Sequence, residues 1–406
     1  MNCRHCNTKL SHLFIDLGFA PPSNEYLKKQ DLNSPEVTFP LRVFVCHNCW
    51  LVQTEDYSSA DELFKSDYAY FSSTSSSWLV HAKKYTNNII KRLNLDNNSY
   101  VIEVASNDGY LLKNFVSKKI PCLGIEPTIS AAKKSEKLGI KVIKEFFGIK
   151  LANKLSNKKA DLICGNNVYA HVPDINDFTN GIRILLKDEG TVTFEIPHLL
   201  KLIEYSAFDT IYHEHYSYIS LISAAKIFQK AGLRIYDVEE LDTHGGSIRI
   251  YGCHKNAKIL PSSNVDRLLK KENKFGLNKI ETYNNFKYQV NLIKNKFINF
   301  LIKQKNNNKK IVAYGAAAKG NTLLNYSGIK NDLIDYVYDA APSKQNKFLP
   351  GSHIPILHPD HLKVYKPDWI IIFPWNLSKE IKKDLKYIKS WGGKFVVFIP
   401  KFRIFK

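Results

Sequence analysis

Four cysteines near the N-terminus are arranged as two pairs that could bind one metal ion. Cys3 and Cys6 form one CxxC knuckle, and Cys46 and Cys49 form a second one about 40 residues later. Two such knuckles can supply the four thiolates of a tetrahedral zinc site. The alternatives are a histidine inside a knuckle replacing a thiolate, a redox CxxC pair, or four unrelated buried thiols. The paired spacing favours a structural zinc site with four cysteine ligands.

A second group of reactive side chains lies near the middle of the chain, where Tyr212, His213, Glu214 and His215 are consecutive. Histidine titrates near neutral pH, so it can act as a general base without a large pKa shift. The HExxH spacing of zinc proteases is absent. On an extended backbone, Tyr212 and Glu214 would face one side and the two histidines the other. The alternative is a hydrogen-bonded cluster without catalysis.

The elements around this cluster alternate between strands and helices, which predicts a doubly wound α/β domain. The first strand ends near Glu103, and a turn with few glycines follows it. Ligands of open α/β sheets bind at the carboxyl ends of the strands. Strands are expected over residues 100–105, 121–127, 141–143, 161–164, 191–196, 233–241 and 247–254.

The carboxyl edge of this predicted sheet favours S-adenosylmethionine (SAM) over NAD. NAD sites usually carry GxGxxG, which is missing here. Glu126 closes the second strand, where a carboxylate can accept from both ribose hydroxyls of a nucleoside. A generic nucleotide-binding turn is the alternative. The predicted cofactor-binding residues on this edge are Glu103, Ala105, Asn107, Gly109, Glu126, Asn166 and Asn167.

A long polar helix is expected over residues 262–305, and a second α/β pattern begins after the polar hinge at 304–310. Four further strands, IVAYG, DYVYD, WIIIF and KFVVFIP, predict a second Rossmann-like sheet. The expected domains are therefore a zinc-binding domain at 1–60, a SAM-binding domain at 61–255 and a Rossmann-like domain at 256–406.

The chain carries 58 Lys and Arg against 38 Asp and Glu, a net charge of +20. Only 8 of the 58 are Arg, the residue best suited to phosphate and base contacts, so we expect no nucleic-acid partner. The N-terminus has no apolar signal segment, and the longest apolar stretch, 369–375, is too short for a bilayer. We expect a cytoplasmic monomer without disulfides.

Several motifs together resemble one enzyme family. They are the paired CxxC knuckles, EVASNDGYLL, GIEP, NNVYAHVPD, YHEHYSYIS, HGGSIRIY and YGAAAKGNTLLNY, in this order over nearly the whole chain. This set resembles the three-domain nucleotide-sugar C-methyltransferases, which act on keto-deoxysugars carried by a nucleoside diphosphate. The resemblance implies a zinc domain, a central class I SAM domain, and a C-terminal domain that helps to hold the nucleotide-sugar.

The resemblance also implies roles for individual residues. Tyr212, Glu214 and His215 would take the active-site positions, with His215 as the base; His171 is a further catalytic match and Tyr70 a cofactor-site match. A base is needed because methylation at the carbon next to a ketone passes through an enolate, whose oxyanion needs donors. His171 by itself could equally be a capping or core histidine.

The C-terminal turn at 315–322 superficially suggests a P-loop, but Asn321 stands where that motif requires Lys. Backbone N–H groups of such a turn can still bind an anion, here the diphosphate of the sugar nucleotide. A tight turn without a ligand is the alternative. The predicted substrate-binding residues are Gly315, Lys319, Asn321, Lys344 and His244.

Three rival functions remain open at this point. An RNA methyltransferase would need focused basic and aromatic patches. A zinc-ribbon interaction protein would not bind SAM. A sugar O- or N-methyltransferase would need no carbon acid. The sequence leaves the sugar, the nucleotide base and the methylated ring carbon undetermined.

Overall fold

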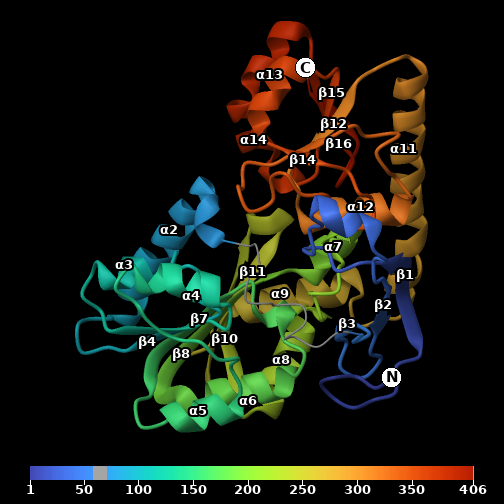
Figure 1. Cartoon of the computed structure of the whole chain (residues 1–406). Coiled ribbons are helices and arrows are strands. Elements are labelled where there is room, and N and C mark those ends of the chain that lie inside the picture. Colours follow the sequence, from blue (N-terminus) through green and yellow to red (C-terminus); the bar gives the residue numbers. More distant parts are fainter. Residues whose placement is uncertain (58–70, 406) are drawn as a thin grey trace.

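The computed structural model describes residues 1–57 and 71–405, in which three β-sheets pack against one another (Figure 1). The N-terminal sheet is antiparallel, with the order β1-β2-β3-β9. Its strands are β1 (His12–Ala20), β2 (Phe39–Val45), β3 (Val52–Thr54) and β9 (Ser217–Tyr218). Strand β9 directly follows the Tyr-His-Glu-His segment, so that segment is anchored on the N-terminal sheet.

The central sheet has the order β10-β11-β8-β7-β4-β5-β6. The five strands from β8 to β6 are parallel, and β11 returns antiparallel beside β8. The predicted doubly wound sheet is therefore confirmed. Its strands are β4 (Val101–Val104), β5 (Cys122–Ile125), β6 (Lys141–Ile143), β7 (Ala160–Asn166), β8 (Leu186–Pro197), β10 (Leu233–Leu241) and β11 (Ser247–His254).

Helices cover both faces of the central sheet (Figure 1). They are α2 (Ser76–Leu93), α3 (Leu112–Val116), α4 (Ile129–Glu136), α5 (Ile149–Leu155), α6 (Ile175–Leu185) and α8 (Leu221–Lys230). The short helix α7 (Leu199–Glu204) follows β8 and faces the C-terminal part of the molecule.

The C-terminal sheet has the order β14-β13-β12-β15-β16-β17, with only β17 antiparallel. The four predicted strands are present as β12 (Ile311–Tyr314), β13 (Val337–Tyr338), β15 (Trp369–Ile372) and β16 (Lys394–Val397). The short edge strands β14 (Ile356–Leu357) and β17 (Arg403–Phe405) were not predicted. The helices of this part are α12 (Ala318–Ser327), α13 (Leu362–Tyr365) and α14 (Ser378–Asp384).

The prediction of one continuous helix over 262–305 is wrong. The segment forms α9 (Ser263–Phe275), α10 (Glu281–Asn284) and α11 (Phe286–Asn306). Gly276 ends α9 in a left-handed conformation, with φ 95°, and its N–H bonds to the carbonyls of Glu272 and Asn273. A glycine at this position satisfies the last carbonyls of a helix and turns the chain away.

One apolar cluster joins the N-terminal and C-terminal parts. It contains Phe14 of β1, Leu199 of α7, Phe297 of α11 and Ile311 of β12. Figure 1 shows α11 running alongside β1 and up to the C-terminal sheet. The shared core fixes these parts relative to each other, which matters because the candidate site takes residues from all of them.

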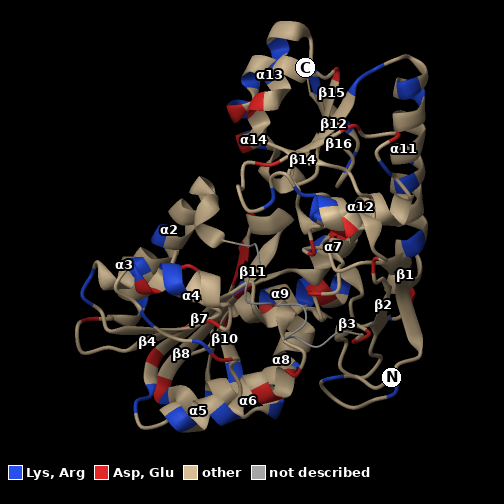
Figure 2. Ribbon diagram, in the orientation of Figure 1, with Lys and Arg blue, Asp and Glu red and all other residues tan. Residues whose placement is uncertain are grey.

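The positive charge is dispersed over the molecule. Figure 2 shows Lys and Arg on helices of every part, with acidic residues interspersed among them. Among residues 1–57 and 71–405, no helix is long and apolar enough to cross a membrane.

Candidate functional site

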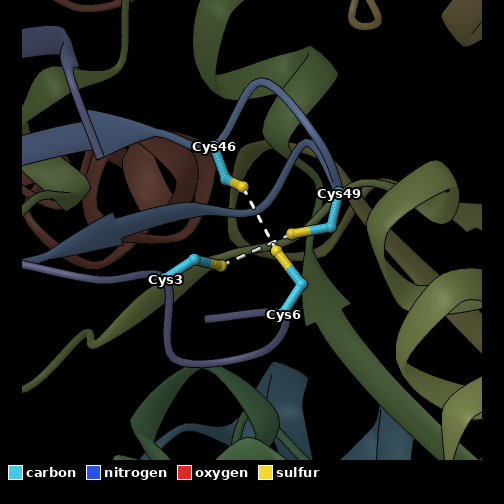
Figure 3. Close-up of side chains that lie close together, drawn as sticks. All are labelled: Cys3, Cys6, Cys46 and Cys49. Carbon is cyan, nitrogen blue, oxygen red and sulfur yellow. Dashed lines mark hydrogen bonds between the residues drawn. The ribbon is translucent and has the colours of Figure 1, made fainter. Parts of the chain in front are cut away.

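The four N-terminal cysteines converge on one point (Figure 3). Their sulfur atoms all lie within 4.8 Å of one another, with Sγ–Sγ distances of 3.5 Å between Cys3 and Cys49 and 3.4 Å between Cys6 and Cys46. A tetrahedron with Zn–S bonds of about 2.3 Å needs sulfur separations of about 3.8 Å. The arrangement therefore fits a zinc ion with four thiolate ligands.

Neither knuckle histidine joins this cluster. His5 Nδ1 contacts Asn176 Oδ1 of α6 at 2.8 Å, and His47 packs edge-on against the ring of His12. Asn7 and Trp50, each just after the second cysteine of a knuckle, have positive φ values of 62° and 65°. The two knuckles therefore turn back in the same way and aim their sulfurs inward.

The zinc-binding module is fastened to the central domain. The Lys230 ammonium of α8 donates to the His5 carbonyl at 2.7 Å, and Lys226 donates to the Asn48 carbonyl at 2.5 Å. Both contacts involve backbone groups inside a knuckle. The fold of the module around its metal therefore decides how the N-terminal part sits on α8.

The turn after β4 has the left-handed backbone conformations of a glycine-rich loop, although it contains only one glycine. Ala105, Asn107 and Gly109 all have positive φ, at 57°, 48° and 79°. A left-handed alanine costs about 1 to 2 kcal/mol. At Gly109 a Cβ atom would come within 2.7 Å of Ile140 Cδ1. The backbone thus forms a tight turn at the carboxyl end of β4, although most of the expected glycines are missing.

Glu126 holds this turn from the end of β5. Its two carboxylate oxygens accept from the N–H groups of Asn107, at 2.9 Å, and Thr128, at 2.8 Å. Asn107 Oδ1 in turn accepts from the N–H of Ser72, at 2.9 Å, just before α2. Burial raises the pKa of Glu126. The carboxylate predicted to hold a ribose therefore also shapes the turn.

Several buried polar atoms on this edge have no hydrogen-bond partner within the described residues. They include both oxygens of Glu103 and one oxygen each of Asp108 and Asn166. Glu103 is fully buried, and burial, followed by repulsion from Glu126 and Asp108, raises its pKa well above the usual value. Native proteins rarely leave such atoms unpaired, so they fit a polar ligand such as SAM.

The two asparagines at the end of β7, Asn166 and Asn167, have side chains that contact different parts of the site. The Asn166 amide donates to the hydroxyl of Tyr110 at 3.3 Å, on the cofactor edge. Asn167 has φ 55°, and its amide contacts His244 Nε2 at 2.8 Å. Asn167 therefore connects the cofactor edge to the turn at His244. Tyr70, the remaining predicted cofactor residue, lies outside the described residues.

The Tyr-His-Glu-His segment is a turn, so the prediction of an extended segment is wrong. The N–H of His215 donates to the carbonyl of Tyr212 at 2.9 Å. This turn places the Tyr212 hydroxyl 2.8 Å from His215 Nε2, with the two rings 4.0 Å apart. Contacts from distant parts of the chain hold this turn, and an alternating pattern in the local sequence gives no information about such contacts.

His215 has one defined tautomer. Its Nδ1 lies 2.8 Å from the carbonyl of Thr210, and a carbonyl can only accept, so Nδ1 carries the proton. The lone pair of Nε2 then faces the Tyr212 hydroxyl. Burial, followed by the nearby His171, lowers the pKa of His215 well below its usual value. A neutral imidazole whose Nε2 carries no proton is the form that can accept one, once the Tyr212 hydroxyl turns away.

His171 and Glu214 surround this imidazole without hydrogen bonding to it. The rings of His171 and His215 are 4.6 Å apart, and His171 Nδ1 donates to the Glu214 carbonyl at 2.7 Å. Burial lowers the pKa of His171 to about 4. The Glu214 carboxylate accepts from the N–H and the side-chain amide of Asn24, at 3.2 and 2.9 Å. The group that orients His215 is therefore Thr210, and the Glu214 side chain takes no part in orienting it.

Asn24 is a site residue that the sequence did not reveal. It lies in the Pro-Pro-Ser-Asn stretch at 21–24, which has only the composition of a turn. Its contact with Glu214 spans 190 residues. No local signal indicates such a pairing.

A small cavity lies between the central and C-terminal parts, beside His215. Its walls include Thr210, His215, His244 and Trp375. The Lys319 ammonium reaches this boundary, 3.4 Å from the His244 carbonyl and 4.5 Å from the centre of the Trp375 ring. Two of the predicted substrate residues, Lys319 and His244, are thus brought next to the candidate base.

The other predicted substrate residues lie in three places: Gly315 on the turn after β12, Asn321 in α12, and Lys344 in the segment after β13. The Lys344 ammonium donates to the Ala316 carbonyl at 2.8 Å. Gly315 has φ 90°, and a Cβ there would come within 2.5 Å of Pro374 Cδ. Asn321 is fully buried and its amide donates to the carbonyl of Ser23 at 2.6 Å. Asn321 therefore links α12 to the N-terminal part and does not line the cavity.

The fold and the cofactor edge define a SAM-dependent methyltransferase. Residues 80–238 match a family described as methyltransferase domain, residues 3–64 a zinc binding domain, and residues 242–400 a C-methyltransferase C-terminal domain. The C-methyltransferase NovU of Streptomyces niveus is 31% identical over 404 residues, covering 99% of this chain and 96% of NovU. The chain therefore belongs to the family of SAM-dependent C-methyltransferases that includes NovU.

Solved structures of methyltransferases are similar to less than half of the chain. A SAM-dependent methyltransferase from Clostridium acetobutylicum is 14% identical, with 44% of this chain and 91% of that chain covered and a TM-score of 0.35. Magnesium protoporphyrin IX methyltransferase from Synechocystis, solved with bound SAM, is 10% identical, with 43% and 80% covered and a TM-score of 0.33.

Proposed function

We propose that this enzyme methylates the carbon next to the ketone of a nucleoside-diphosphate keto-deoxysugar. The observation that carries the proposal is the buried, neutral His215, whose Nδ1–H is fixed by Thr210 and whose Nε2 lone pair is available as a base. A positioned general base of this kind can take the proton from a carbon next to a ketone. The family relationship to a C-methyltransferase supports the same choice.

The reaction follows from this geometry. His215 Nε2 takes the proton from the carbon, and the C–H electron pair moves into the enolate, whose charge collects on the former ketone oxygen. Tyr212 lies beside the same nitrogen and would donate to that oxygen. His171 lines the same place with its ring, but its Nδ1–H is already donated to the Glu214 carbonyl. The enolate carbon would then form its new bond to the methyl group that SAM supplies, while the sulfur–methyl bond breaks and its electron pair stays on the sulfur. The proton stays on His215 until solvent removes it.

SAM supplies an electrophilic methyl group bound to a sulfonium. Glu126, at the end of β5, is placed to accept from its ribose hydroxyls, as ligand sites at this edge of α/β sheets do. Glu103 and Asn166 carry unpaired buried oxygens on the same edge. We assign them, with Ala105, Asn107 and Gly109, to cofactor binding, while Asn167 connects this edge to His244.

The C-terminal turn would hold the diphosphate. The turn between β12 and α12 lies beside two ammonium groups, Lys319 and Lys344. Burial lowers the pKa of Lys319, and the Asp209 carboxylate partly opposes this shift without coming within 4.0 Å of it in the described residues. A buried ammonium whose one acidic neighbour forms no ion pair with it can still bind an anionic ligand. The Glu214 oxygen that has no partner in the described part of the chain fits a sugar hydroxyl.

SAM affinity should rise with pH because of Glu103. Burial and the neighbouring carboxylates raise the pKa of Glu103 and so disfavour its ionised form, whereas a bound sulfonium cation would favour the ionised form. SAM binding should therefore release a proton and tighten as the pH rises through the pKa of Glu103. Titration calorimetry in buffers of different ionisation enthalpy measures that proton. Glu126, Asp108, Tyr110, Cys122 and Cys164 also face Glu103.

The Glu103→Gln variant should bind SAM without this proton release. Glu136→Gln on the exposed surface of α4 is the matched control and should behave like the wild type. An unchanged proton release in Glu103→Gln would assign the titration to another carboxyl group.

A substrate panel tests the proposed function. The enzyme and SAM are incubated with nucleoside-diphosphate 4-ketosugars and, in parallel, with the same nucleotide-linked hexoses lacking the ketone. We expect a mass gain of one methyl group only on ketosugars. Methylation of the ketone-free sugars would favour an O-methyltransferase.

A further inference from the structure

The base candidate His215 depends on a short 3₁₀ turn, η4 (Phe208–Thr210). The carbonyl of Thr210, the last residue of η4, accepts from His215 Nδ1 at 2.8 Å. The Thr210 hydroxyl bonds back to the Ala207 carbonyl at 2.7 Å. The position of η4 therefore decides which nitrogen of His215 carries the proton.

The C-terminal part of the molecule holds η4 at the adjacent residue. Trp375 follows β15, and its indole N–H donates to Asp209 Oδ2 at 2.8 Å across 166 residues. Asp209 is 2% exposed, and its second oxygen has no partner in the described residues. From α12, the Thr322 hydroxyl donates to the carbonyl of Ile211 at 2.7 Å. The C-terminal part therefore forms hydrogen bonds with the residues on both sides of Thr210, Asp209 and Ile211.

Contacts on the indole ring of Trp375 restrict its orientation. One face of the indole packs against Gly245, where a Cβ atom would come within 2.1 Å of Trp375 Cη2. The Lys319 ammonium lies 4.5 Å from the ring centroid. A large aromatic ring held in this way directs its N–H toward one acceptor, the Asp209 carboxylate.

We propose that Trp375 and Asp209 are positioning residues through which the C-terminal domain sets the tautomer of His215. The inference rests on the proposed function only in treating His215 as the base. It gives the C-terminal domain a second task beside substrate binding, because the base keeps its Nε2 lone pair only while Trp375 is in place. Neither residue needs to touch the substrate for this effect.

The tautomer can be measured without substrate. In protein labelled with ¹⁵N at histidine, the ring-nitrogen shifts of His215, assigned by comparison with His215→Asn, report which nitrogen is protonated. We expect the Nδ1–H form in the wild type and a mixture of tautomers in Trp375→Phe. Trp391→Phe is the matched control, since that indole donates to the Pro367 carbonyl at 3.1 Å within the C-terminal part. An unchanged His215 spectrum in Trp375→Phe would overturn the proposal.

Two variants of Asp209 separate positioning from general stability. Asp209→Asn keeps an acceptor for the indole, whereas Asp209→Ala removes it. We expect the wild-type tautomer in Asp209→Asn and a mixture in Asp209→Ala, with kcat for ketosugar deprotonation about tenfold lower in the latter, as for one lost neutral hydrogen bond. KM should stay within about twofold, because Asp209 is absent from the wall of the cavity beside His215.

Equal tautomer populations in the two Asp209 variants would contradict the proposal, as would a change in KM alone. Thermal unfolding of each variant identifies one that has lost its fold, in which case Trp375→Phe and Asp209→Asn carry the test. If no ketosugar is a substrate, the proposed function fails while the NMR result still decides this inference.

Discussion

His215→Asn should lose both methyl transfer and solvent-deuterium exchange at the carbon next to the ketone. Asparagine can keep the contact with the Thr210 carbonyl, but it offers no lone pair basic enough to take a proton from carbon. A positioned general base contributes about 10²- to 10⁴-fold, so we expect a loss of at least about 10²-fold. The measurement is deuterium incorporation from D₂O into a nucleotide-linked 4-ketosugar, followed by NMR.

His213→Asn is the control for this experiment. His213 is two residues away and also buried, but its Nε2 donates to the Pro40 carbonyl at 3.2 Å, away from His215. It should keep exchange within a few-fold of the wild type. Full exchange in His215→Asn would place the base elsewhere, with His171 the next candidate because its ring lies 4.6 Å from that of His215.

Removal of zinc should have the second-largest effect, and it should reach the active site. Cys46→Ala removes one of the four thiolates, and small zinc modules depend on the metal for folding. The N-terminal part supplies Asn24 to Glu214 and the Ser23 carbonyl to Asn321. We expect loss of bound zinc, a lower melting temperature and a drop in methyl transfer of more than about tenfold.

Zinc content by elemental analysis and melting by calorimetry measure this effect. Cys122→Ala is the control, because Cys122 starts β5 of the central sheet and lies outside the cysteine cluster. Full zinc content in Cys46→Ala would contradict the four-thiolate site. Loss of zinc with full activity would show that the N-terminal module does not support the catalytic segment.

The sheets could be predicted from the sequence because their signals are local. Buried apolar runs such as that at β4 and the turn residues after them repeat through the central and C-terminal parts. The short edge strands β14 and β17 were missed because prolines flank β14 and basic residues interrupt the apolar positions of β17, so neither has the pattern of a buried strand. The break at Gly276 was visible as a glycine, but whether a glycine ends a helix depends on the packing around it.

The residue types of the candidate site could be predicted from the sequence better than the contacts between those residues. The cysteine cluster and Glu126 were predicted from spacing and from position on the sheet. Tyr212 and His215 were predicted from the density of ionisable groups in their segment and from the family resemblance, and their catalytic roles stay predictions. The contacts from Asn24 to Glu214 and from Trp375 to Asp209 span 190 and 166 residues, and no local pattern encodes them. The same long-range contacts bend the Tyr-His-Glu-His segment, which therefore differs from the expected extended form.

The most direct test of the central claim is the bond that the transferred methyl group forms. With SAM labelled by ¹³C in its methyl group and a nucleotide-linked 4-ketosugar, the product can be examined by carbon NMR. We predict a methyl carbon bonded to a ring carbon next to the ketone. A methyl carbon bonded to oxygen or nitrogen would contradict the account.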